Sequence, residues 1–427
     1  MPNVAEIRGM KDVLVDALSG GVATVAEMHA AIARYPFAIL ERIPTTRLPA
    51  AAVRVVHDQI AASVYGTLRG VTAGAGLAAD VALVPLRHGV GPQDRPVWLD
   101  LALGALNGVV GDRLEERGNA LRMPMELCHA GRALALDADA LRRSFPGATG
   151  RLAVFVHGLA GHDLVWRLYA REHWGDPETT YGSLLARDLG YTPLYLRYNS
   201  GLHVSENGAR LAEKLEALVR AWPVAVDEIV LVGHSMGGLV ARSACHQDAQ
   251  NDRAWIRAVR HVVCLGSPHL GAPLEKLGNL ASWALGALEV TRPLARIVNG
   301  RSAGIKDLRF GYLAEEDWRD RDPDALLEDN RHDIPFLDTA AHYFVAATVT
   351  RSPDHPVAWI LGDTLVRLPS ASGGGAPRAR RIPFRDEHGR HVGALSHMQL
   401  LNHAVVYEQL RAWLVRPGLV LSEPRGV

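Results

Sequence analysis

The hydrophobic pattern of the chain changes near residue 120, where short and almost continuous apolar runs begin to alternate with longer stretches of helical period. Continuous runs of this length are typical of strands that are buried on both faces. Their alternation with helices predicts an α/β fold, a mostly parallel sheet with helices on both faces. The runs are Leu152–Val156, Leu194–Tyr198, Ile229–Val232, His261–Leu265 and Tyr343–Val349, and the helical stretches include Val204–Ala221, Leu239–Ala249 and Ala404–Val415. A hairpin of Met125–His129 and Arg132–Leu136 is expected before the first run.

Residues 1–118 show only helical periodicity. The capping-box pair Thr24 and Glu27 starts one helix, and a second begins after Pro49. A third helix is expected from the apolar spacing of Leu99, Leu103, Leu106, Val110 and Leu114. These stripes lack the Lys- and Arg-rich polar faces of membrane-surface helices, so we expect them to pack against the main domain. The sequence thus predicts an N-terminal helical accessory region at 1–118 and a main domain at 119–427.

The composition of the chain bears on its partners, its redox compartment and its relation to membranes. Lys and Arg number 46 against 46 Asp and Glu, so the charge balance does not indicate a nucleic-acid partner. Cys128, Cys245 and Cys264 are odd in number and far apart, which favours free core thiols in a reducing compartment. No apolar run reaches the roughly 18 residues of a spanning helix, although peripheral contact with lipid is compatible with the sequence. Acidic residues interrupt Met1–Phe37 where a signal peptide would be apolar, and we expect a soluble cytoplasmic protein.

The candidate chemistry centres on Val230–Gly238, where a buried strand runs into Gly-x-Ser-x-Gly and a helix of small residues follows. This is the pattern of a nucleophile elbow, in which the serine sits on a sharp turn between strand and helix. Gly233 and Gly237 lack a Cβ and let strand and helix approach each other closely. The alternative is a plain glycine-rich turn. Because the strand and the helix are both present, the pattern favours Ser235 as a nucleophile.

Two further segments supply candidate partners for the serine. The loop after the first run, Val156–Leu159, is where enzymes of this architecture place an oxyanion donor, so the backbone N–H groups of Leu159 and Met236 are expected to form the hole. The triad order Ser, acid, His then indicates Asp363 and His397. We expect His397 Nε2 to lie within hydrogen-bond reach of Ser235 Oγ.

The acid and the base each have rivals. Asp338, Asp354 and Asp386 are the alternative acids, and Asp338 is weakened because it precedes the strand that should carry the acid. His403 is the alternative base, although its place at the last helix favours capping or packing.

Candidate substrate contacts lie in three places. His157 is expected to hold the oxyanion loop; a solvated histidine or a metal ligand are alternatives, and metal is the least favoured because no Cys, His or Asp lies at ligand spacing. Gly266–His269 follows the fourth run, and Pro268 and His269 form either a pocket wall or a plain turn. An apolar stretch with Trp283 opens residues 279–318, which are expected to form a lid over an acyl pocket or, alternatively, a core helix. No cofactor or metal is expected.

Several motifs together resemble a known family: Val156–Leu159, Tyr198–Gly201, Gly233–Val240, Gly266–Pro273, Gly362–Val366 and His397–His403. They are similar to the bacterial lipase and esterase branch of the α/β-hydrolases, and to the catalytic domain of eukaryotic GPI inositol-deacylases. The resemblance covers roughly residues 120–416. It implies the α/β-hydrolase fold and a serine acyl-enzyme route, with Ser235, Asp363 and His397 at the family's catalytic positions. The long connection from Thr350 to Asp363 departs from the family pattern.

Three functions remain open from the sequence. The favoured one is hydrolysis of a carboxylic, lipid-like ester through an acyl-enzyme. Acyl transfer to an acceptor other than water would use the same triad. A catalytically inert binding scaffold is the third, and the presence of all three candidate triad residues argues against it.

Overall fold

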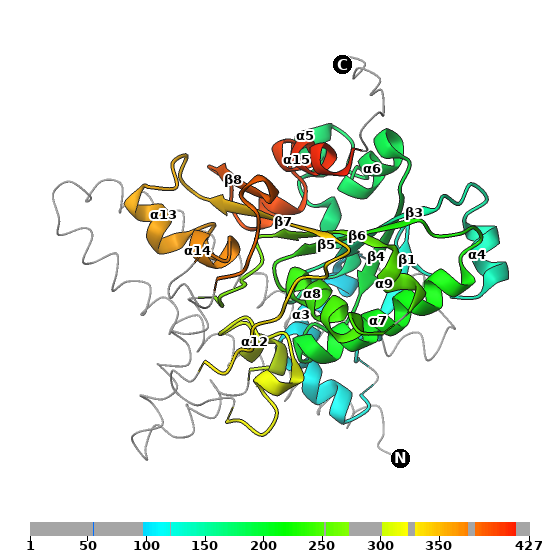
Figure 1. Ribbon diagram of the computed structural model, residues 1–427, viewed down its shortest axis with the longest axis horizontal. Helices are drawn as coiled ribbons and strands as arrows, with labels where there is room; N and C mark the ends of the chain where they lie inside the picture. The colour runs from blue at the N-terminus through cyan, green and yellow to red at the C-terminus, as the bar shows by residue number, and fades with distance from the viewer. Residues whose placement is uncertain are drawn as a thin grey trace, which may run out of the picture.

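An eight-stranded sheet forms the centre of the protein (Figure 1). The computed structural model describes residue 54 and residues 97–119, 121–251, 253–272, 301–322, 329–374 and 381–415. The strand order is β2-β1-β4-β3-β5-β6-β7-β8. Strand β1 runs antiparallel to β2 and β4, and all other neighbouring strands are parallel. The strands are β1 Glu126–His129, β2 Arg132–Ala133, β3 Arg151–Val156, β4 Thr192–Arg197, β5 Glu228–His234, β6 Val259–Leu265, β7 Ala341–Thr348 and β8 Gly389–Gly393.

The apolar runs of the sequence are the central strands. All five are present as β3 to β7, and the predicted hairpin is present as β1 and β2. Strand β5 is buried at every position, as expected for a strand covered on both faces. Val156 of β3 pairs with Gly233 of β5, so the loops after these two strands emerge side by side. The prediction of a mostly parallel sheet is confirmed.

Helices cover both faces of the sheet (Figure 1). Helices α6 and α15 pack on one face around a core that contains Tyr181 and Leu410, and α7 and α8 pack on the other around Leu215 and Leu239. The predicted helices in the main domain are confirmed as α7, α8 and α15. The helices of the main domain are α4 Ala138–Ser144, α5 Ala170–Trp174, α6 Tyr181–Leu189, α7 Val204–Ala221, α8 Met236–Asp248, α9 Ala254–Ala258, α12 Ala303–Asp307, α13 Pro356–Leu361, α14 Leu368–Ala371 and α15 Ala404–Leu414, with single turns at Asp163–Arg167, Glu315–Asp317, Asp386–His388 and Met398–Leu401.

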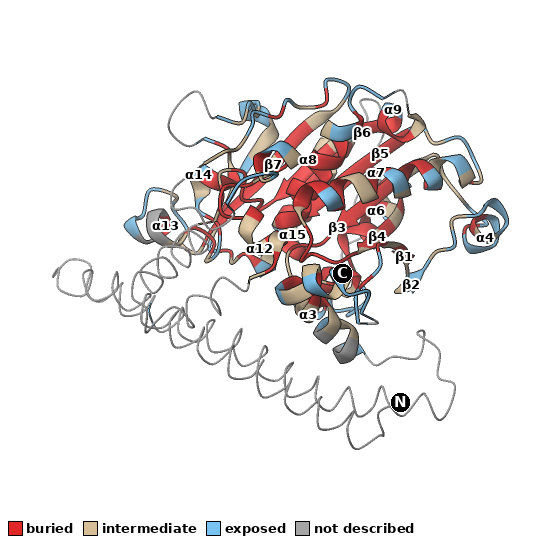
Figure 2. Cartoon of the chain, turned by 90° about the horizontal axis from the view of Figure 1, so that it is seen from below, coloured by how far each residue is buried: buried red, intermediate tan, exposed pale blue. Residues whose placement is uncertain are grey.

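One helix of the N-terminal region belongs to the described residues. Helix α3, Val97–Glu116, agrees with the third helix predicted from the sequence and lies beside α12 (Figure 2). The first two predicted helices fall on residues 1–96, which apart from residue 54 lie outside the described part, so the division at residue 118 stays a prediction. Among the described helices, none combines the length and the apolar character that crossing a bilayer requires.

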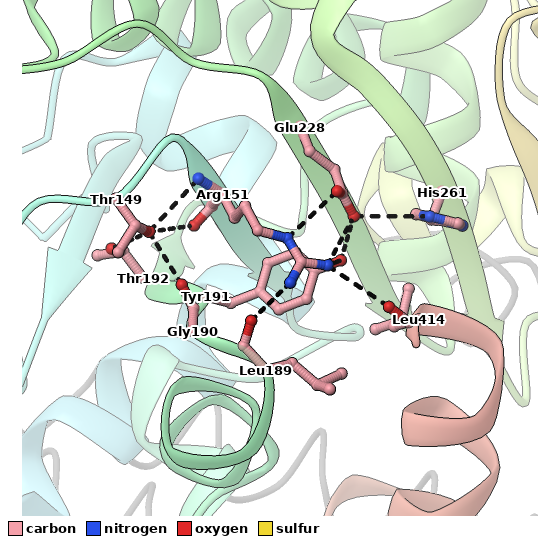
Figure 3. Close-up of polar contacts among 9 residues, drawn as sticks. All are labelled: Thr149, Arg151, Leu189, Gly190, Tyr191, Thr192, Glu228, His261 and Leu414. Atoms are coloured by element: carbon pink, nitrogen blue, oxygen red, sulfur yellow. Dashed lines mark hydrogen bonds and ion pairs between the residues drawn. The ribbon is translucent and has the colours of Figure 1, made fainter. Parts of the chain in front are cut away.

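A polar cluster joins the strands at the amino edge of the sheet, where the parallel strands begin (Figure 3). Arg151 at the start of β3 forms an ion pair with Glu228 at the start of β5, with Nε 3.2 Å from Oε2. Tyr191 donates to the same carboxylate, and His261 of β6 lies 3.6 Å from it. Arg151 also donates to the carbonyl oxygens of Leu189, at 2.6 Å, and of Leu414 at the end of α15, at 3.4 Å. This amino-edge cluster therefore ties three strands to the helices above them.

Candidate active site

Ser235 lies on a sharp turn between β5 and α8, as the elbow pattern predicts. Its φ of 53° and ψ of −125° are strained for a residue with a side chain, and its N–H is fixed by a 2.8 Å hydrogen bond to Leu265 O. A Cβ on Gly233 would lie 2.4 Å from Gly238 Cα, so only glycine lets the strand and the helix meet this closely. Ser235 is half-buried between fully buried neighbours, which leaves its hydroxyl at the surface of the elbow.

Asp363 and His397 form a buried pair at the same edge of the sheet. Asp363 lies in the turn after α13, and His397 Nδ1 donates to its Oδ2 at 2.7 Å. The other carboxylate oxygen accepts the N–H groups of Leu365 and Val366 at 3.0 and 2.8 Å. The carboxylate is thus fully engaged, and it selects the tautomer of His397 that leaves Nε2 as an acceptor.

The histidine is connected to the elbow through its backbone. His234, which precedes the serine, donates from Nε2 to His397 O at 3.0 Å. Gly266 follows Leu265, which accepts the Ser235 N–H, and it packs closely against the Asp–His pair. A Cβ at this position would lie 3.2 Å from both His397 Cε1 and Asp363 Oδ2. His397 Nε2 is buried and has no hydrogen-bond partner, so the expected bond to Ser235 Oγ is not formed in this structure. Bonds of this kind often tighten only when substrate is bound.

The loop after β3 runs directly against the serine. A Cβ on Gly158 would lie 2.9 Å from Ser235 Cβ, and one on Gly237 would lie 2.1 Å from Val156 O. Within this loop, Ala160 N–H donates to Ser200 Oγ at 2.9 Å. For the N–H groups of Leu159 and Met236, the structure records no hydrogen bond to a described residue. These are the two donors that the sequence predicts for an oxyanion hole.

His157 holds the start of this loop. Its ring is fully buried, stacks on Tyr198 at 4.3 Å between centroids, and donates from Nδ1 to Gly158 O at 2.8 Å. Burial lowers the pKa of His157 to about 4, so it is neutral at physiological pH. The position agrees with the expected bracing role, whereas a substrate contact of His157 stays a prediction.

The rival residues lie elsewhere. Asp338, Asp354 and Asp386 are exposed, and no contact between any of them and His397 is recorded among the described residues. His403 caps α15 by accepting the Val405 N–H at 3.2 Å, as its position in the sequence suggests. The structure therefore brings Asp363 and His397 together and leaves their rivals apart.

Of the three remaining substrate-contact candidates, two belong to a packed turn. Pro268 and His269 are buried, and His269 Nδ1 accepts a hydrogen bond from Arg242 at 3.1 Å. Burial and the charge of Arg242 hold the pKa of His269 well below its usual value. Trp283 lies outside the described residues, and of the proposed lid only 301–318 is described. That part includes α12, where a Cβ on Gly304 would lie 3.0 Å from Met236 Cε. A lid over the site stays a prediction.

Part of the chain matches a known family. Residues 147–282, which contain β3 to β6 and Ser235, match the family described as "PGAP1-like alpha/beta domain". Together with the strand order, this match indicates the α/β-hydrolase fold. No curated protein matches its sequence.

Solved structures with a similar fold include three bacterial or archaeal proteins. The mature lipase BlEst2 of Bacillus licheniformis is 19% identical over 62% of this chain and 92% of its own, with a TM-score of 0.40. A lipase-esterase related protein of Clostridium acetobutylicum is 14% identical over 68% and 99%, with a TM-score of 0.33. An esterase of Pyrococcus furiosus is 14% identical over 62% and 81%, with a TM-score of 0.34.

Sequence reasoning assigned no role to two residues that shape the candidate site. Ser200 holds the oxyanion loop by accepting the Ala160 N–H, and His234 holds the backbone of His397. Ser200 lies in the Tyr198–Gly201 motif, a turn whose polar residues follow a buried strand at the carboxyl edge, and that position was the available signal. His234 offers no comparable signal because its partner lies 163 positions away.

Proposed function

We propose that this chain hydrolyses carboxylic esters through an acyl-enzyme intermediate, with Ser235 as nucleophile, His397 as general base and Asp363 as its orienting partner. The observation that carries the proposal is the pairing of a strained serine with a buried Asp–His pair whose Nε2 atom is left without a partner. Strain and an unpaired buried acceptor both cost stability, and such costs are concentrated at sites of chemistry.

In the proposed reaction, Ser235 Oγ attacks the ester carbonyl while its proton passes to His397 Nε2. The N–H groups of Leu159 and Met236 bind the oxyanion that develops on the carbonyl oxygen. His397 then returns the proton to the departing alcohol, and the acyl group remains on Ser235. Water attacks the acyl-enzyme while its proton passes to His397, which then gives that proton to the departing Ser235 Oγ, so that the carboxylic acid is released and the free serine is restored. Asp363 stabilises the imidazolium in both steps and does not itself become protonated.

The substrate class follows from the family resemblance alone, and we propose an ester with a medium or lipid-like acyl chain. A series of p-nitrophenyl esters from acetate to palmitate measures this preference. Analysis of the products with an added alcohol acceptor distinguishes hydrolysis from acyl transfer, which the same three side chains would support.

A fluorophosphonate probe tests the proposal directly. The wild-type protein should be labelled at one serine, and Ser235→Ala should lose both the label and ester turnover. Ser144→Ala, which removes an exposed serine at the end of α4, is the matched control and should keep both. Labelling that persists in Ser235→Ala, or a wild-type protein that neither labels nor turns over any ester of the series, would overturn the assignment.

A further inference from the structure

Helix α3 lies directly on the loop that carries the Leu159 N–H. A Cβ built on Gly104 would lie 2.5 Å from Gly161 O, and one built on Gly108 would lie 2.6 Å from Ala160 Cα. Both neighbours are main-chain atoms, which cannot rotate away as a side chain can. Glycine in a helix interior is less favourable than alanine by about 1 kcal/mol, yet only glycine permits this approach.

The opposite side of the same loop rests against the nucleophile. A Cβ on Gly158 would lie 2.9 Å from Ser235 Cβ, and Ala160 is held at a φ of 58° by the hydrogen bond of its N–H to Ser200. The loop is therefore in contact with α3 on one side and with the elbow on the other. A left-handed conformation at a residue with a Cβ persists only when its surroundings impose it.

Helix α3 is itself anchored at the level of this contact. Its regular geometry is interrupted at Val110, with φ −134° and ψ 18°. Carbonyl oxygens on either side of the interruption accept hydrogen bonds from the main domain: Gly108 O from Ser302 Oγ at 2.6 Å, and Gly111 O from Asn199 Nδ2 at 2.8 Å. These bonds fix the helix against two different segments of the main domain, one before α12 and one after β4.

We propose that α3 positions the oxyanion loop, and that Gly104 and Gly108 are positioning residues for catalysis. The inference rests on the proposed ester hydrolysis and gives the described part of the N-terminal region a role in it. The helix contributes no group to the reaction. It acts through Ala160 and Gly161, the two residues that follow Leu159, whose N–H must point at the oxyanion.

A methyl group at position 108 should therefore move the loop. This movement should impair the proposed oxyanion hole more than it impairs substrate binding. Loss of a single oxyanion donor lowers kcat by about 10²–10³, and a misplacement of roughly 1 Å costs about 10². We expect Gly108→Ala to lower kcat by about 30- to 300-fold and to change KM by less than about threefold, because an oxyanion hole acts mainly on the transition state. Gly104→Ala, whose new methyl group would press mainly on the Gly161 carbonyl group, farther along the loop, should give the same pattern with a smaller loss.

The experiment compares kcat per active site, counted by fluorophosphonate titration, for hydrolysis of p-nitrophenyl butyrate. Counting sites separates misfolded protein from slow enzyme. A trifluoromethyl ketone with the same acyl chain provides the second readout, because its adduct with serine places an oxyanion in the hole. Its inhibition constant should rise in parallel with the fall in kcat/KM. Val109→Ala on the exposed face of α3, and Gly147→Ala, where a Cβ meets nothing within 4 Å, are the controls and should match the wild type.

The outcomes separate this inference from the proposed function. A folded Gly108→Ala or Gly104→Ala variant with wild-type kcat per titrated site overturns the positioning role, while the function stands. A rise in KM without a fall in kcat also overturns it, because that result places the contact in substrate binding. If the wild type itself shows no titratable serine, the proposed function fails. If Gly108→Ala yields no titratable sites, Gly104→Ala decides the question on the same readouts.

Discussion

Two buried polar regions of the sheet differ in how their polar groups are paired: the amino-edge cluster around Arg151 and the loops at the carboxyl edge. In the amino-edge cluster, all three guanidinium nitrogens of Arg151 donate to oxygen atoms, which belong to Glu228, Tyr191 and two backbone carbonyls (Figure 3). At the carboxyl edge, buried polar atoms without a hydrogen-bond partner occur in the loops after β3, β6 and β8: His157 Nε2, Ser267 Oγ, His269 Nε2 and His397 Nε2.

Backbone strain is concentrated at the carboxyl edge without being confined to it. Of the seven described non-glycine residues with positive φ, Ala160, Ser235, Thr364 and Ala394 lie in the loops after β3, β5, β7 and β8, whereas Ala130, in the β1–β2 turn, lies beside the start of β4. Thr364, at φ 99°, adjoins Asp363 and is β-branched, which makes its conformation especially unfavourable. The described residues of the amino-edge cluster have none. Strain of this kind costs about 1–3 kcal/mol at each position. The cluster around Arg151 thus joins strands and helices, whereas the carboxyl-edge loops concentrate strained residues and buried polar atoms without partners, as the proposed function requires.

The largest effect on activity should come from removing the Ser235 hydroxyl. Ser235→Ala should lower kcat by about a millionfold, in analogy with the triad of subtilisin, because only the oxyanion hole and binding remain. Its melting temperature should stay close to that of the wild type, since a half-buried hydroxyl contributes little to packing. Steady-state kinetics and thermal unfolding, measured on the same preparation, check both statements. A large loss of stability with residual activity above one per cent would place Ser235 among the structural residues.

The partners of the serine should come next in size. We expect His397→Ala to abolish measurable turnover and Asp363→Asn to lower kcat by about 10⁴, as loss of the orienting acid does in other triads. His403→Ala and Asp354→Asn are the matched controls, because one histidine caps α15 and the other carboxylate is exposed. Each should keep most of the activity. The reverse pattern in either pair would reassign that member of the triad.

The sequence predicted the Asp363–His397 pairing and the elbow at the carboxyl edge better than the amino-edge cluster, because the candidate catalytic residues lie in recognisable local patterns. Ser235 lies in a motif of five residues, and the strand and helix around it are visible in the same stretch. His397 and Asp363 follow in the order that the architecture requires. The Arg151–Glu228 pair, by contrast, joins residues 77 positions apart, and neither residue stands in a recognisable pattern. Only the register of β3 and β5, which pairs Arg151 with Glu228, brings them together.

The same reasoning explains which parts of the fold escaped prediction. The central strands could be predicted because strands that are covered on both faces of a sheet have nearly continuous apolar sequences. Strand β8, Gly389–Gly393, contains two glycines and an arginine and buries only Val392, so it exists through its pairing with β7 rather than through its composition. Likewise, Gly104 and Gly108 of α3 weaken a helix when read locally, and their use depends on a loop that lies some 50 positions away.

A substitution in the amino-edge cluster should lower the free energy of unfolding and leave kcat unchanged. Glu228→Gln leaves the largely buried guanidinium of Arg151 without its carboxylate, and breaking a buried pair from one side costs about 3–5 kcal/mol. We expect a loss of about 3 kcal/mol in the free energy of unfolding, since the Arg151 side chain keeps 15% of its surface exposed. Urea unfolding measures this loss of stability, and kcat per titrated site should be unchanged. Asp139→Asn, which breaks the exposed pair with Arg142, should leave stability unaltered. A variant of Glu228 that lost activity per site would show that the two edges are coupled.

The smallest effect should appear at alkaline pH, through Tyr191. Burial and the neighbouring Glu228 carboxylate raise the pKa of Tyr191, so the folded protein holds this proton above pH 10, where an unfolded tyrosine releases it. Because the folded state then binds more protons than the unfolded state, the free energy of unfolding falls as pH rises, by up to about 1.4 kcal/mol per pH unit for one proton. Tyr191→Phe has no such proton and should show a shallower decline between pH 10 and 12, in addition to a loss of about 1.5–3 kcal/mol at neutral pH from the missing hydrogen bond to a charged group. Urea unfolding across this pH range compares the slopes. Equal slopes would mean that Tyr191 ionises freely, and the cluster around Arg151 would then not hold the Tyr191 proton as its hydrogen bonds indicate.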